Sequence, residues 1–232
     1  MPYGNKSPAT VTRFTIEVVR ALLREPVKMV VIGCNTASSV ALGALTDAVD
    51  PTGAVPVIGV IGPGAHAALA HSPRRRIAVI GTERTIQGGA YQRVLKALDP
   101  STEVMGRACP LFVPLAEEGW LTGEITRLTV ERYLADVRAW EPESLILGCT
   151  HYPLLRGVIG EVMGEGVNLI DSSDATAREV KALMEARGLL RGGNDGTSRF
   201  FVTDGPERFQ TVGERFLGGV MGPVELLRLE GT

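Results

Sequence analysis

Short apolar runs alternate with longer amphipathic stretches along the whole of the 232-residue chain. The apolar runs end at glycine, proline or polar residues, which is typical of buried strands. The stretches between them place apolar residues three and four positions apart, as in helices with one buried face. Strands are expected at residues 27–32, 56–60, 77–80, 103–108, 145–147, 167–170, 200–203 and 224–227. Helices are expected at residues 9–24, 36–49, 65–70, 85–98, 123–139, 153–163 and 174–187, and from about residue 206.

Strands that alternate with helices of about 10 to 15 residues are typical of βαβ units on a parallel sheet. Such sheets are covered on both faces, which accounts for strands that are apolar throughout. The fold class is therefore α/β. In open sheets of this kind, ligands bind at the carboxyl ends of the strands.

Capping and turn residues set the expected limits of several elements. Ser7 and Pro8 read as an N-cap followed by a first-turn proline. Thr85 and Asp174 are each expected to cap a helix, because short polar side chains at this position accept a backbone N–H. Loops are expected at residues 51–53, 110–119 (with one helical turn) and 188–196.

Two of the expected strands end in the same Gly-Cys pair. The first is VVIGCNTASS at residues 30–39, and the second is LILGCTHYPLL at residues 145–155. In both, an apolar strand stops at glycine, and a cysteine and polar residues open the next helix. We call these two segments the GC turns, and both lie at the carboxyl end of a strand.

A thiol at the start of a helix faces unpaired backbone N–H groups and the positive end of the helix dipole, which favour the thiolate. The pKa of Cys34 and of Cys149 is therefore expected to lie below the ordinary thiol value, and His151 would add to this effect at Cys149. Two such thiols from two similar substructures predict a site with one thiol on each side of a small ligand. Matched bases on opposite faces of a carbon suit racemisation or epimerisation, with the thiols as general acid and general base.

Other roles for the cysteines fit the sequence less well. A single cysteine near a strand end is more often a small buried apolar residue, and Cys109, between Ala108 and Pro110, is assigned that role. A Cys34–Cys149 disulfide is disfavoured in a reducing compartment. Zinc and thiol oxidoreductase chemistry are disfavoured because the chain has no CxxC pair. A pyridoxal enzyme needs a Schiff-base lysine, and none stands beside the GC turns in sequence.

The composition gives no sign of a nucleic-acid or membrane partner. The formal net charge is −2, and hydrophobic residues make up 44% of the chain. Neither value indicates nucleic acid or an anionic membrane surface as a partner. The sequence has no run of about 18 apolar residues and no N-terminal signal pattern, so a cytoplasmic protein with reduced thiols is expected.

Six stretches of the chain resemble the glutamate racemase family, and they occur in the family's order. GCNTAS and GCTHYPLL together are highly specific, and the six stretches span nearly the whole chain. They are PYG (2–4), GCNTAS (33–38), IAVIGTERTI followed by Ala90-Tyr91 (77–91), CPLFVPLAEEGW (109–120), LILGCTHYPLL (145–155) and IDSSDATA (170–177).

The resemblance implies an enzyme that needs no cofactor or metal, interconverts L- and D-glutamate, and supplies D-glutamate for peptidoglycan. It implies two doubly wound parallel-sheet lobes with the active site in the cleft between them. The first lobe would comprise residues 1–62 and 180–232, and the second residues 63–179. It also implies a homodimer, with glutamate as the small-molecule partner and with no nucleic acid or membrane partner.

Site residues follow from the resemblance by position. Cys34 and Cys149 would be the acid/base thiols, and His151 would tune Cys149. Glu117 is similar to a carboxylate that assists at the cleft in some members, although on composition alone it is equally an ordinary solvated acid. The implied substrate-binding residues are Tyr3, Gly4, Asn35, Thr36, Thr82, Thr85, Thr150 and His151.

The sequence departs from the family pattern in two places. Gly62 stands where an acidic residue is frequent, and only a minor effect is expected. Family members also carry a strand, an Asp- and Ser-containing loop, a helix and a second strand before PYG. We hypothesise that the chain as given has weak activity and poor stability, because the sheet that carries Cys34 would expose unpaired strand edges. Equal turnover and equal melting temperature in a version extended upstream would refute this.

Two other functions stay open from the sequence. The first is the same chemistry on aspartate, because the two thiols are better defined than the length of the substrate pocket. The second is a binding protein that keeps the fold and has little activity.

Overall fold

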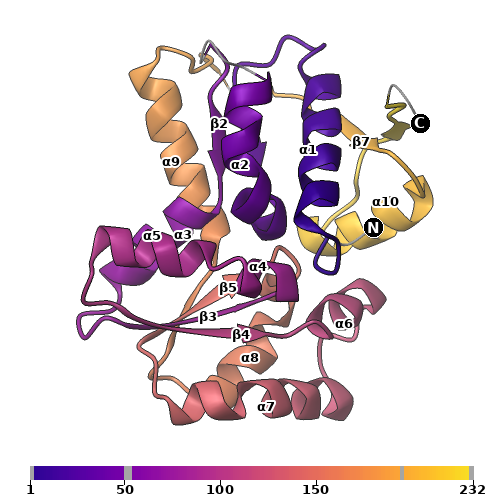
Figure 1. The fold of residues 1–232 in the computed structure, drawn as a ribbon. Coiled ribbons are helices and arrows are strands. Elements are labelled where there is room, and N and C mark those ends of the chain that lie inside the picture. Colours follow the sequence, from indigo (N-terminus) through magenta and orange to yellow (C-terminus); the bar gives the residue numbers. More distant parts are fainter. Residues whose placement is uncertain (1–2, 50–53, 194–195, 230–232) are drawn as a thin grey trace.

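The computed structural model describes residues 3–49, 54–193 and 196–229. Helices and strands alternate along the chain, as expected, and every strand pair is parallel in the part described (Figure 1). The elements are α1 (Pro8–Leu22), β1 (Val30–Ile32), α2 (Asn35–Val49), β2 (Val57–Gly59), α3 (Ile61–Ala70), β3 (Arg76–Gly81), α4 (Glu83–Gln87), α5 (Ala90–Leu98), β4 (Glu103–Ala108), α6 (Phe112–Glu118), α7 (Glu124–Ala139), β5 (Ser144–Gly148), the 3₁₀ helix η1 (Tyr152–Leu155), α8 (Arg156–Met163), β6 (Asn168–Ile170), α9 (Ser172–Ala186), β7 (Phe200–Val202), α10 (Pro206–Leu217) and β8 (Val224–Leu226).

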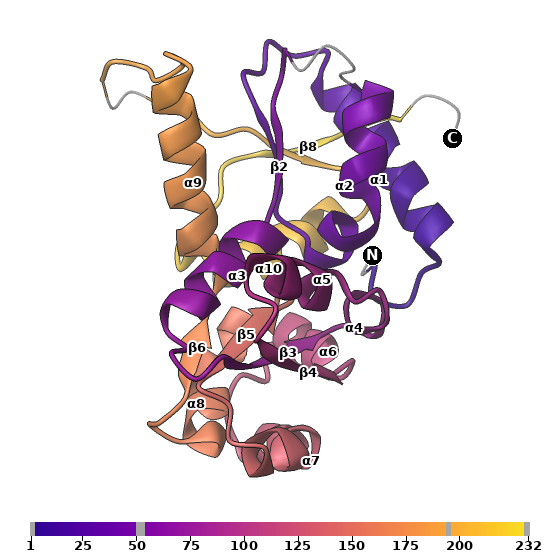
Figure 2. The same cartoon turned by 60° about the vertical axis from the view of Figure 1, so that its left-hand side comes forward.

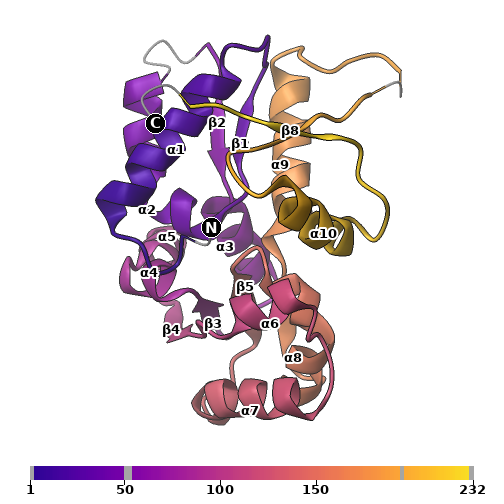
Figure 3. The same cartoon turned by 90° about the vertical axis from the view of Figure 1, so that its right-hand side faces the viewer.

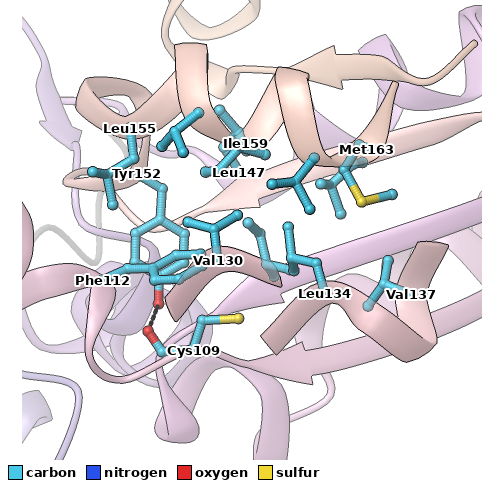
Figure 4. Close-up of a cluster of buried hydrophobic side chains, with 14 of the residues drawn as sticks. Cys109, Phe112, Val130, Leu134, Val137, Leu147, Tyr152, Leu155, Ile159 and Met163 are labelled. Carbon is cyan, nitrogen blue, oxygen red and sulfur yellow. Dashed lines mark hydrogen bonds between the residues drawn. The ribbon is translucent and has the colours of Figure 1, made fainter. Parts of the chain in front are cut away.

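The largest sheet has four strands in the order β4-β3-β5-β6 and carries helices on both faces. Because side chains alternate along a strand, Ile77 and Val79 of β3 face α3 and α5, whereas Ala78 and Ile80 face the other side. On that second side, Phe112, Leu134 and Leu147 pack in one cluster with residues of α6, α7 and α8 (Figure 4). Each of the three side chains is at most 1% exposed. Burial on both faces explains why β5 is apolar from Leu145 to Leu147.

The strand order reverses between β3 and β5. After β3 the chain adds β4 on one side, and it then returns to add β5 and β6 on the other. The two strands that flank this reversal end together, because Gly81 pairs in register with Gly148. Ligands of doubly wound sheets bind at such a switch point, and here it is bounded by Thr82 and Cys149.

A second parallel pair, β1 and β2, presents the other GC turn. Val30 and Ile32 pack against α1 and α2, in a core that includes Val11, Ala41 and Leu45. The two views in Figures 2 and 3 show α1 and α2 on one side of this pair and the β7–β8 pair crossing near it. β7 and β8 pair with each other through backbone hydrogen bonds. Among the described residues, neither strand pairs with a strand of the other two sheets. The lobe limits expected from the resemblance remain a prediction.

Several expected element limits were wrong for identifiable reasons. The helix expected at 85–98 is two helices, because Thr82, not Thr85, is the N-cap and Gly89 adopts a left-handed conformation with φ of 61°. The helix expected from Asp174 is instead capped by Asp171, whose side chain accepts the Ser173 N–H.

Three other segments hold more helix than expected. α3 begins at Ile61, α6 is a seven-residue helix in the expected loop, and the helix expected at residues 153–163 begins as η1. The turn expected at residues 51–53 lies outside the described residues. The Ser7 cap and the strand at residues 103–108 are confirmed.

Gly148 has no room for a side chain. A Cβ atom there would lie 2.6 Å from the carbonyl oxygen of Ile80 on the paired strand. We expect Gly148→Ala to lower the free energy of unfolding by about 1–3 kcal/mol, the usual cost of overpacking a core. The matched control is Gly43→Ala in α2, where a Cβ meets no atom within 4 Å and should stabilise by about 0.5–1 kcal/mol. Urea unfolding of both variants measures this, and equal stability of the two would contradict it.

Candidate active site

A cavity of about 350 Å³ lies where the two GC turns meet. Its walls come from the segment before α1, the carboxyl ends of β1, β3 and β5, and one residue of α6. The lining residues are Tyr3, Gly4, Gly33, Cys34, Asn35, Thr36, Thr82, Val113, Cys149, Thr150 and His151. Both thiols therefore face one small site, and each comes from a different sheet. Gly33 and Val113 were not expected in the lining, and neither residue type carries a polar side chain that would signal it.

Cys34 occupies the N-cap position of α2. Its carbonyl accepts the Ser38 N–H at 2.8 Å, and its Sγ lies 3.5 Å from the Ala37 nitrogen, as a capping side chain would. Burial raises the pKa of the thiol above its ordinary value, although the N–H groups of Ala37 and Thr36 and the Thr36 hydroxyl act in the opposite direction.

Cys149 follows the last residue of β5 and is only 7% exposed. Burial raises the pKa of this thiol to about 12, and the nearby Cys34 and Glu117 act in the same direction. The backbone N–H of His151 opposes the shift. The expectation that both thiols have lowered pKa values was therefore wrong, because burial outweighs the helix-start effect. In the protein as described, both groups are thiols at neutral pH.

His151 and Glu117 lie behind Cys149. Nδ1 of His151 is 3.8 Å from Cys149 Sγ, and its Nε2 is 3.3 Å from a Glu117 carboxylate oxygen. Burial lowers the pKa of His151 despite the charge of Glu117, so the imidazole is neutral near pH 7. A carboxylate only accepts hydrogen bonds, so Nε2 carries the proton and Nδ1 is free to accept one from the Cys149 thiol. Glu117 thus acts through His151 and does not line the cavity itself.

Helix α10 contacts this pair from outside the cavity. The Arg208 guanidinium lies 3.0 Å from Glu117 and 3.2 Å from Glu118, and Arg215 donates to the Glu117 carbonyl. The Phe216 ring meets the His151 ring edge-on, with centroids 5.5 Å apart. The sequence did not reveal these contacts, because they join residues some 65 to 100 positions apart without a local motif.

Three threonine hydroxyls form a buried cluster beneath the cavity wall. The Thr36, Thr82 and Thr85 Oγ1 atoms lie 3.0–3.2 Å from one another. Thr36 and Thr82 line the cavity, whereas Thr85, which was expected to bind substrate, does not line it and hydrogen-bonds to the other two hydroxyls from behind. The cluster joins α2 to the end of β3, so it ties the two sheets together at the site.

Two further contacts close the cavity. Thr150 donates to the Gly33 carbonyl at 2.9 Å, which joins one GC turn directly to the other. Gly4 packs so closely on Thr82 that a Cβ on Gly4 would lie 2.7 Å from the Thr82 Cβ. The Gly4 carbonyl also accepts the Arg84 N–H at 3.3 Å, so Gly4 is held at the site from the start of α4.

The cysteines themselves are free thiols. Cys109 is fully buried in the core cluster shown in Figure 4, and it is not among the residues that line the cavity. Among the described residues, no group of three or more His, Cys, Asp or Glu side chains is placed to hold a metal ion. In the same part of the chain, no helix is both long and apolar enough to cross a membrane.

The class of protein follows from an α/β fold in which two thiols line one cavity, Cys149 at the strand switch point and Cys34 at the end of β1. The chain belongs to the Asp/Glu/hydantoin racemase family, whose model matches residues 1–180. It is 48% identical over 231 residues to the glutamate racemase of Geobacter metallireducens, a match that covers 99% of this chain and 84% of that protein.

Solved structures agree with this placement. Glutamate racemase RacE1 from Bacillus anthracis superposes with a TM-score of 0.92 at 36% identity, over 98% of this chain and 84% of that one. The glutamate racemase of Francisella tularensis in complex with D-glutamate has the same TM-score at 34% identity, over 100% and 85%. An aspartate racemase from Picrophilus torridus, 20% identical with a TM-score of 0.52 over 76% and 69%, shares the fold alone.

Proposed function

We propose that this protein racemises glutamate by moving protons between the substrate Cα and the thiols of Cys34 and Cys149. The observation that carries the proposal is that both thiols line one cavity and come from two different sheets. The names of the relatives support the substrate, since the proteins at 40–48% identity are glutamate racemases. The more distant likeness to an aspartate racemase gives no comparable support for aspartate.

One proton is taken from the substrate and one is returned to it in each turnover. One sulfur, as thiolate, takes the Cα proton and becomes a thiol, which leaves a carbanion stabilised by the adjacent carboxylate group. The other sulfur, as thiol, gives its proton to the opposite face of Cα and becomes a thiolate. The product is the other enantiomer, and the two thiols have exchanged roles, so the reverse reaction needs no additional group.

The reactive state needs one thiolate, and His151 is placed to form it at Cys149. Neutral His151 accepts the proton of Cys149 through Nδ1, and Glu117 stabilises the imidazolium that results. The Asn35 side-chain amide offers N–H donors to the substrate carboxylates, and Thr36, Thr82 and Thr150 line the cavity beside it. Its volume of about 350 Å³ suits a small molecule.

Hydrogen exchange at Cα tests the proposal. In heavy water, the protein should incorporate deuterium at Cα of glutamate while L- and D-glutamate interconvert, and aspartate in a parallel reaction should exchange much more slowly. Exchange that is faster with aspartate would assign the protein to aspartate. No exchange with either amino acid would indicate a binding protein. The supply of D-glutamate for peptidoglycan, the cytoplasmic location and the homodimer remain predictions of the resemblance.

A further inference from the structure

Tyr91 connects the core of the four-stranded sheet to the cavity, and the reaction described above does not use it. It is the second residue of α5 and only 1% exposed. Its hydroxyl donates to Oδ1 of Asn35 at 2.7 Å, and Asn35 lines the cavity as the first residue of α2. The contact links an element of one sheet to the GC turn of the other.

Two glycines make room for the Tyr91 ring. A Cβ on Gly148 would lie 3.3 Å from Cε2 of the ring, and a Cβ on Gly64 would lie 3.2 Å from the hydroxyl. The ring belongs to the buried cluster with Val79, Ile146 and residues of α3. Packing therefore holds the hydroxyl at one position, as a rigid anchor for the side chain it touches.

The hydrogen bond also sets which way the Asn35 amide points. Burial raises the pKa of Tyr91, so the phenol keeps its proton near neutral pH. The interaction with the Ser172 side chain opposes that rise, and the protonated phenol donates to Asn35. With Oδ1 turned to Tyr91, the Asn35 NH₂ group lies on the other side of the amide, and it has no partner among the described residues.

We propose that Tyr91 is a positioning residue that holds the Asn35 NH₂ group toward the cavity, where it donates to a carboxylate oxygen of the amino-acid substrate. The identity of that substrate rests on the proposed function. The reversed amide would place Oδ1 against the substrate carboxylate, and two acceptors without a shared proton repel. Tyr91 thus contributes to recognition of an anionic group that it does not touch.

The Tyr91→Phe variant removes the hydroxyl and keeps the ring. We expect KM and Kd for glutamate to rise by about tenfold, because the amide is then free to turn. The turnover number should change by less than about threefold, because neither thiol loses a partner. KM and kcat come from racemisation kinetics, and Kd from calorimetry with D-glutamate.

Tyr152→Phe is the matched control. The Tyr152 hydroxyl is equally buried and donates to the Cys109 carbonyl at 2.8 Å, inside the core (Figure 4). Both variants lose one buried hydrogen bond, so both should lower the melting temperature by similar amounts. KM should rise only in Tyr91→Phe. In an Asn35→Ala background, Tyr91→Phe should cause no further rise in KM or Kd, because the group it positions is gone.

An unchanged Kd in Tyr91→Phe, an equal rise in Tyr152→Phe, or additive effects with Asn35→Ala would each overturn the role of Tyr91. A wild-type protein that binds glutamate without racemising it would overturn the proposed function, while the ratio of Kd values would still decide the role of Tyr91. A wild-type protein that does not bind glutamate would overturn both.

Discussion

Replacement of Cys34 or Cys149 by serine is expected to lower the turnover number for glutamate by about 10²–10⁴-fold in both directions, the usual contribution of a general acid or base. Serine is nearly isosteric with cysteine, so the cavity should keep its shape. Its hydroxyl is a far weaker acid than a thiol, however, and supplies almost no anion near neutral pH. In each variant the turnover number should fall in both the L-to-D and the D-to-L direction, because every turnover uses one sulfur as base and the other as acid.

Cys109→Ser controls for the loss of a thiol as such. Cys109 is fully buried and lies outside the cavity lining, so the variant should lose stability and keep its turnover number. Circular dichroism of the glutamate enantiomers measures turnover, and thermal melting measures folding. Retention of more than half of the activity in Cys34→Ser or Cys149→Ser would remove that thiol from the mechanism.

The rate should depend on pH through His151. Burial raises the pKa of both cavity thiols, that of Cys149 to about 12, so near neutral pH the free protein holds almost no thiolate. The catalytic thiolate therefore forms by proton transfer from Cys149 to neutral His151, which releases no proton to solvent and does not depend on pH while the imidazole is neutral. We expect kcat/KM to change by less than about threefold between pH 7 and pH 8.5.

At lower pH His151 gains a proton, and kcat/KM should fall. Burial lowers the pKa of His151, so this imidazole is neutral at pH 7 and gains a proton only in more acidic solution, where it can no longer accept the Cys149 proton. The measurement is kcat/KM at constant ionic strength, with circular dichroism at each pH to confirm folding. A rate that rises by about tenfold per unit from pH 7 to pH 8.5 would show instead that the thiolate forms by loss of a proton to solvent and not by transfer to His151.

Much of the fold could be predicted because its signals are local. The strand at residues 103–108 is confirmed at both ends, and α2 and α7 each begin within one residue of their expected starts, since apolar runs and periodic apolar faces reflect burial directly. The N-cap errors arose where two capable residues stand three apart. Thr82 and Thr85 both suit the position, and the choice depends on the path of the chain out of β3.

The site was predictable in outline for a different reason. Cys34 and Cys149 each end a strand, and the carboxyl ends of parallel strands are where ligands bind, so the sequence placed both thiols at one cavity. The pKa shifts had the opposite sign from the expected one, because local sequence shows the helix start but not the burial around it. The contacts of Tyr91 with Asn35 and of Arg208 with Glu117 depend on tertiary packing, and no motif reports them.

The central claim is that each thiol serves one face of Cα, and one-thiol variants test it most directly. Cys34→Ala and Cys149→Ala should be incubated in heavy water with L-glutamate and with D-glutamate separately, and deuterium at Cα should be measured in the enantiomer supplied. Each variant should exchange the hydrogen of one enantiomer without racemising it, and the two variants should prefer opposite enantiomers. Exchange of the same enantiomer by both variants, or equal exchange of both enantiomers by either one, would contradict the two-thiol account.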